Sequence, residues 1–190
     1  MTYESVLAFV KSRFSEREQE HALCAERFVC ELFEKAPPAL RIAALCHDID
    51  RSFPQWRTDT AVSEYARAKD VHAGMSASLF AHLRLVDDES LVRDVCFLIT
   101  RHEHGPTEKE PVMDSHTNSF DLVYAAKILW YADKLTFFAL EIESYAKRGQ
   151  KALENKIVFS LEGLSADVKQ RAVDKSPMPF KSLVKKIAFE

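Results

Sequence analysis

The sequence predicts an all-α protein built as a single domain. Apolar residues recur at three- and four-residue spacing in one segment after another, which is the period of helices that bury one face. Only four glycines occur among the 190 residues, and no stretch shows the alternation of a half-buried strand. With 47% hydrophobic residues, the chain is long enough for one compact core and short for two.

Three helices are expected in the first quarter of the chain. The first runs from about Tyr3 to Phe14 and the second from about Glu18 to Lys35, before Pro37 and Pro38 break the chain. A third follows and ends before Pro54. Its buried face of small apolar residues leads directly into a His-Asp pair.

Two further helices are predicted in the middle of the chain. Asp70 is a suitable N-cap for a helix that begins near Val71 and continues to about Leu85, which places His72 on its first turn. The next helix starts after Asp88 and ends near His102, where a Gly-Pro pair stops it.

The last third begins with a loop from Gly105 to Thr117, which we expect to border or cover a site. The longest helix then runs from about Asn118 to Lys147, with Ser115 or Thr117 as its cap.

A weaker helix is expected over Lys151 to Phe159, and Ser176 to Pro179 interrupts the tail before Phe180 to Phe189. The expected organisation is one domain over residues 1–150, with residues 151–190 as a helical extension packed on it.

Composition narrows the classes of partner. With 26 basic and 29 acidic residues, the chain has no broad basic field, so we expect neither an extended nucleic acid nor a membrane surface as partner. It lacks an apolar leader and any apolar run near the roughly 18 residues that span a bilayer, which favours a cytoplasmic enzyme. The cysteines lie in apolar periodic segments without metal-site spacing, so we expect buried, reduced thiols at Cys24, Cys30, Cys46 and Cys96.

Imidazole and carboxylate side chains occur on separate predicted helices. His21 lies on the second helix, His47 and Asp48 end the third, and Asp133 lies on the longest. Divalent cations take these ligand types, and a site needs them to converge from several helices because one helix supplies only one face. The pattern predicts a metal site.

This pattern resembles the HD superfamily of metal-dependent phosphohydrolases. The resemblance lies in Cys46-His47-Asp48-Ile49-Asp50, in the upstream His21, and in Tyr131-Ala132-Asp133-Lys134-Leu135. It covers about residues 18–143 and implies a helical bundle with a metal site at its centre.

Two histidines between the dyad and Asp133, namely His72 and His102, match the interval in which binuclear members carry two histidines. The resemblance then implies that Asp48 bridges two ions, with His21, His47 and Asp133 on the first and His72 and His102 on the second. We therefore expect one or two divalent ions, and the sequence does not distinguish Fe, Mn, Mg, Ni and Zn.

Cations near the motif are candidates for contacting a phosphate, namely Arg51, Arg101 and Lys134, although surface or ion-pair roles are equally compatible with the sequence. His104 is expected either to face substrate or to replace His102 as a ligand. His82 and His116 are expected to be solvated.

Within the superfamily, the layout resembles the bacterial diadenosine tetraphosphate hydrolases. They share the dyad, an Ala-Asp pair and a His-x-x-Gly segment, which here is His102-Glu103-His104-Gly105. They commonly have a lysine after the dyad, where this chain has Asp50-Arg51, and that departure leaves the nucleotide open. The expected substrate is a small phosphorylated molecule, with Phe53 and Trp56 either stacking on its base or packing. The sequence allows a homodimer.

Two other classes share parts of the pattern. Diiron oxygenases of the HD fold, which act on small polar substrates, carry the same ligand order, and the metal and its surroundings would separate them from hydrolases. A degenerate HD protein that only binds a ligand would have lost at least one ligand, and this chain retains the set.

Overall fold

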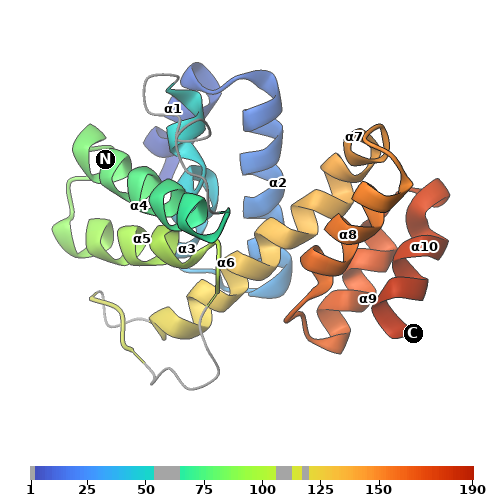
Figure 1. The fold of residues 1–190 in the computed structure, drawn as a ribbon. Coiled ribbons are helices and arrows are strands. Elements are labelled where there is room, and N and C mark those ends of the chain that lie inside the picture. Colours follow the sequence, from blue (N-terminus) through green and yellow to red (C-terminus); the bar gives the residue numbers. More distant parts are fainter. Residues whose placement is uncertain (1–2, 54–64, 106–112, 117–119) are drawn as a thin grey trace. The chain divides into compact units, whose positions relative to one another are not determined.

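The computed structural model describes residues 3–53, 65–105, 113–116 and 120–190 (Figure 1). Within these ranges the regular structure is helical, and β-pairing is limited to an isolated bridge between Asp114 and Asp121. The predicted all-α class is confirmed. By its internal contacts the chain divides into two compact units, Met1–Ala132 and Asp133–Glu190. The boundary falls inside a helix and earlier than residue 150; the expected packing of residues 151–190 on the rest stays a prediction.

The first unit is built around a short buried helix. α1 (Tyr3–Arg13) and α2 (Glu16–Leu32) precede α3 (Pro38–Cys46), and both pack against it. Ser15 and Glu18 form a capping box at the start of α2, which satisfies backbone N–H groups that the helix leaves unpaired. The residues of α3 from Ala39 to Cys46 are buried except Arg41. This apolar helix therefore ends in the interior of the unit.

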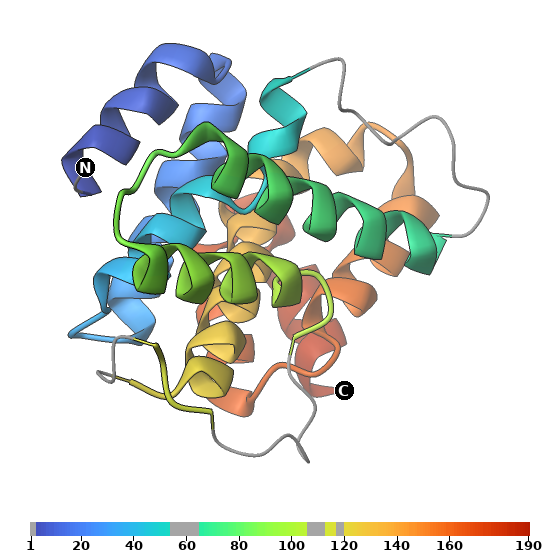
Figure 2. The ribbon, with the colours of Figure 1, turned by 90° about the vertical axis from the view of Figure 1, so that its left-hand side faces the viewer.

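α4 (Tyr65–Leu83) and α5 (Glu89–Arg101) lie side by side and complete this part of the unit (Figure 2). The Asp88 carboxylate caps α5 by accepting from two backbone N–H groups, and His102 follows its last turn, as expected. The predicted start of α4 was wrong. Asp70 lies within the helix, because the helix-forming residues before it continue the helix toward the N-terminus. His72 therefore lies well inside α4 instead of on its first turn.

The longest predicted helix is present, with a later start, an interruption and the predicted end near Lys147. α6 spans Leu122–Thr136, and Asp121 caps it by accepting from the Val123 N–H at 2.9 Å, so the start predicted at Asn118 and the cap predicted at Ser115 were wrong. Thr117 lies outside the described residues. A π-helical turn, η3 (Phe137–Glu141), separates α6 from α7 (Ile142–Ala146).

The second unit continues with α8 (Gln150–Leu161), α9 (Ala166–Lys175) and α10 (Met178–Phe189). α8 matches the helix expected from Lys151, whereas α9 was not predicted. α10 packs against both α8 and α9, and the buried side chains include Phe138, Ile157 and Val184.

Two sequence expectations concern the whole chain. All four cysteines are free thiols, with Cys24 and Cys46 buried and Cys30 and Cys96 partly exposed. Among the described residues, no helix combines the length and apolar character needed to cross a bilayer.

Candidate metal centre

The dyad lies where the buried helix α3 ends. His47 is the C-cap of α3 and Asp48 follows it, leading into the short 3-10 helix η1 (Ile49–Ser52). His47 is only 1% exposed, and its Nδ1 lies 2.9 Å from the Ala44 carbonyl oxygen. Because a carbonyl can only accept, Nδ1 carries the proton of that bond, and Nε2 is the ring nitrogen that faces the dyad carboxylate. The end of α3 thus fixes both the position and the tautomer of His47.

A first group of donors forms around one oxygen of Asp48. His21, from α2, places its Nε2 3.1 Å from the Nε2 of His47. The two imidazole nitrogens lie 3.6 and 3.8 Å from Asp48 Oδ2, and the ligand atoms of all three residues are within 4.8 Å of one another. The structure therefore brings together three of the predicted ligands of the first ion.

A second group forms around the other oxygen of the same carboxylate. His72 Nε2 lies 2.8 Å and His102 Nε2 3.7 Å from Asp48 Oδ1, again with all ligand atoms within 4.8 Å. His102 is 1% exposed, and its Nδ1 donates to the Ile99 carbonyl oxygen at 2.6 Å. Like His47, it points its Nε2 lone pair toward Asp48 because the helix end holds its other nitrogen.

The Asp48 carboxylate is thus shared between two histidine pairs. Arg51 also contacts it, with its Nη1 2.7 Å from Oδ2. Burial alone would raise the pKa of Asp48, but Arg51, His47 and His72 together hold it well below its ordinary value. The carboxylate is therefore ionised and surrounded by donors of the kind that bind divalent cations.

A second aspartate, which the sequence analysis gave no role, orients His72. Asp50 is 2% exposed; its Oδ2 accepts from His72 Nδ1 at 2.7 Å, and its Oδ1 accepts from the Ser76 hydroxyl at 2.9 Å. Metal-binding histidines commonly have such a carboxylate behind the ring, because it fixes the ring and makes the other nitrogen more basic.

The electrostatic surroundings shift the pKa values of the two histidines of the second group in opposite directions. Burial would lower the pKa of His72, but the hydrogen bonds to Asp48 and Asp50 raise it to about 10. Burial and the neighbouring His47 instead lower the pKa of His102 to about 4. Without a bound cation, His72 thus carries the positive charge between the two carboxylates, and His102 is neutral.

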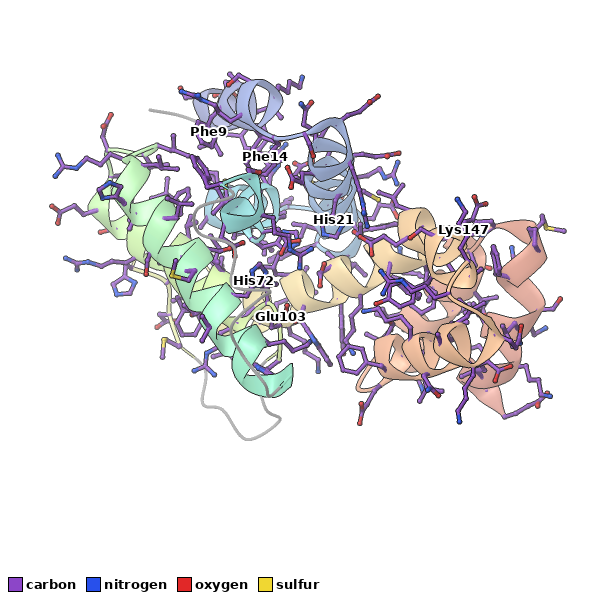
Figure 3. All side chains as sticks on the ribbon, turned by 45° about the horizontal axis from the view of Figure 1, so that its top comes forward. Phe9, Phe14, His21, His72, Glu103 and Lys147 are labelled. Carbon is purple, nitrogen blue, oxygen red and sulfur yellow. The ribbon has the colours of Figure 1, made fainter. Side chains whose placement is uncertain are left out.

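Two further charged residues that sequence reasoning missed lie beside this second group. Glu103 Oε1 is 4.0 Å from His72 Nε2 and 3.9 Å from His102 Nε2, while its Oε2 pairs with Lys69 Nζ at 2.5 Å. Figure 3 shows His72 and Glu103 next to each other, with His21 on the α2 side. A signal was present: positions 69, 72 and 76 share one face of α4, and all three carry polar residues.

Other predicted residues lie elsewhere. His104 is exposed and belongs to neither donor group, and His102 provides the imidazole at this helix end. Lys134 donates to the carbonyl oxygens of Phe159 and Glu162 within the second unit, which gives it a structural role there. Asp133 is half-buried on α6 as the first residue of that unit, and its place in the ligand set stays a prediction.

The other residues that the sequence singled out are Arg101, His82, His116, Phe53 and Trp56. Arg101 lies over the ring of Phe97, and His82 is exposed, as expected. His116 is exposed as expected, and its backbone N–H and its Nδ1 both contact the buried carboxylate of Asp94, at 2.8 and 2.7 Å. Phe53 is half-buried, and Trp56 lies outside the described residues.

Comparison of the chain with protein-family models, with curated proteins and with solved structures finds no match. Interpretation of this centre therefore depends on the chemistry of its own residues.

Proposed function

We propose that this chain is a metal-dependent hydrolase that cleaves a phosphate ester or anhydride at a site for two divalent ions. The observation that supports it best is that the two oxygens of Asp48 face different histidine pairs. Oδ2 lies toward His21 and His47, and Oδ1 lies toward His72 and His102. A carboxylate flanked in this way is suited to bridge two cations. Ions bound there would act as Lewis acids and would lower the pKa of water toward neutrality.

The protein's own contribution is a fixed and desolvated set of donors. The Nδ1 atoms of His47 and His102 are hydrogen-bonded to backbone carbonyls, and the Nδ1 of His72 is hydrogen-bonded to Asp50. Their Nε2 atoms are therefore aimed at Asp48 before any ion binds. Pre-organisation of this kind lowers the entropy lost on binding and favours complete occupancy.

Arg51 is the residue best placed to contact a substrate phosphate. It lies at the rim of the centre, with its side chain 47% exposed and its guanidinium against Asp48. An arginine between a carboxylate and solvent can bind phosphate oxygens in a planar, two-point geometry. We extend the proposal to a nucleotide as substrate, with Asp133 as a further ligand, on the basis of the motif resemblance. His104 remains a candidate for substrate contact, whereas the bonds of Lys134 to two backbone carbonyls argue against that role for Lys134.

The test combines metal content with product analysis. Protein purified without added metal is analysed for elements and assayed for phosphate release from a panel of nucleotides and phosphoesters, with and without oxygen. About two ions per chain and oxygen-independent phosphate release are expected, and both should be lost in Asp48→Ala.

His82→Ala serves as the matched control, because His82 lies on the same helix as His72 but is exposed. Asp48→Ala protein that keeps full metal content and full activity would refute the proposal. Two irons with oxygen consumption and no phosphate release would favour the oxygenase instead.

A further inference from the structure

Glu103 occupies an unusual position for a residue in an ion pair. Its side chain is 14% exposed and that of Lys69 is 13% exposed, so both charges are largely removed from water. Desolvating an ion pair generally offsets much of its attraction, and such pairs contribute little to stability compared with an apolar contact. The location of this pair beside two histidines therefore calls for another explanation.

The two oxygens of Glu103 face different partners. Lys69 binds Oε2, which leaves Oε1 directed toward the imidazoles of His72 and His102. The three atoms Glu103 Oε1, His72 Nε2 and His102 Nε2 form a triangle with two sides of 4.0 and 3.9 Å and a third below 4.8 Å. The point equidistant from the three atoms lies about 2.1 to 2.5 Å from each, which is the range of metal–ligand bond lengths for imidazole and carboxylate.

We propose that Glu103 is an additional carboxylate ligand for the cation held by His72 and His102, through the oxygen that does not pair with Lys69. With Asp48, this would give the second position two imidazoles and two carboxylates. Glu103 makes this position richer in oxygen and in negative charge than His72, His102 and Asp48 alone would. Oxygen-rich sets suit harder cations, so the second position should favour Mn²⁺ or Mg²⁺ over softer ions.

This assignment rests on the two-ion centre proposed above but makes a separate claim about it. A purely structural Lys69–Glu103 pair and a ligand Glu103 predict opposite effects of removing Lys69. If the pair is structural, losing either partner disturbs the site in the same direction, because each leaves the other charge unpaired. If Glu103 is a ligand, removing Lys69 removes a competing cation and leaves the carboxylate available.

The experiment is calorimetric titration of metal-free protein with Mn²⁺, comparing wild type, Glu103→Gln and Lys69→Met. Wild type should bind two ions. Glu103→Gln should raise the Kd of one of them at least about 10-fold, as loss of a ligand or its support typically does, and should leave the other Kd unchanged. Lys69→Met should leave both Kd values unchanged or make one of them lower.

Glu89→Gln is the matched control, because Glu89 is an exposed residue of α5, the helix that precedes Glu103, and pairs with Arg93 at 3.6 Å; its Mn²⁺ binding should equal that of wild type. The proposal is overturned if wild type binds a single ion, if Glu103→Gln leaves both Kd values within twofold, or if Lys69→Met weakens binding as much as Glu103→Gln.

Should Glu103→Gln fail to fold, the direction of the change in Lys69→Met still decides between the two roles. Because the readout is Mn²⁺ binding and not turnover, a protein without phosphohydrolase activity can still confirm the ligand, and an active hydrolase can still exclude it.

Discussion

Asp50→Asn isolates the orienting role of a buried carboxylate with little change in shape. Asp50 is 2% exposed and holds His72 at 2.7 Å and Ser76 at 2.9 Å. An amide keeps the volume and can still accept from His72, but it loses the negative charge that strengthens this bond. Outer carboxylates of metal sites typically contribute 10- to 100-fold to affinity, so we expect the metal held by His72 to bind about 10- to 100-fold more weakly, or ~1.4 to 2.8 kcal/mol.

Competition with a chelator of known affinity measures this change, and Ser76→Ala serves as its control. The serine contacts the other oxygen of Asp50, so its loss should reduce stability by about 1 kcal/mol and should change metal affinity much less. Asp50→Asn protein that unfolds more easily but binds metal as tightly as wild type would refute the reasoning, because Asp50 would then only support the fold.

Three further predictions concern charge, pH and backbone conformation. Arg51→Ala should raise the KM for a phosphorylated substrate more than it lowers metal content, measured by steady-state kinetics and elemental analysis, because half of the Arg51 side chain faces solvent. His72 has an ordinary pKa of 6.5, and the folded protein raises this pKa to about 10. The contribution of His72 to the stability of the metal-free protein should therefore be complete below pH 6.5 and should disappear as the pH rises through about 10. Denaturant unfolding across this pH range should show the decline in wild type, and the decline should be absent in His72→Gln. Gly105→Ala should lower the melting temperature more than Gly149→Ala, because both glycines have positive φ but only at position 105 would an added Cβ meet another side chain, the Trp130 ring at 2.6 Å.

The donors that the sequence predicted were those whose residue type carries chemistry by itself. Histidines at the ends or on the faces of apolar helices were recognisable, and the structure gathers four of them around Asp48. Asp50 and Glu103 were not predicted, because a carboxylate beside a histidine in sequence is usually solvated. Their roles depend on how α4 packs against α5 and η1.

The helix boundaries, too, could be predicted only in part from the sequence. The Asp70 cap signal was strong locally, but the preceding residues continue the helix, and this shift changes which α4 residues share a face with His72. The π-helical turn at Phe137–Glu141 has no sequence signature that we recognise. The role of Asp121 as the cap of α6 was equally hidden, because several polar residues precede that helix and each is a suitable cap.

The central claim is that one carboxylate, Asp48, joins two cation positions, and electron paramagnetic resonance of the Mn²⁺-loaded protein tests it most directly. Wild type should show the signal of two exchange-coupled Mn²⁺ ions, and His72→Ala should show a single uncoupled Mn²⁺ retained by His21 and His47. Asp48→Ala should bind neither tightly. Uncoupled Mn²⁺ in the fully loaded wild type, or coupled Mn²⁺ that survives Asp48→Ala, would contradict the account.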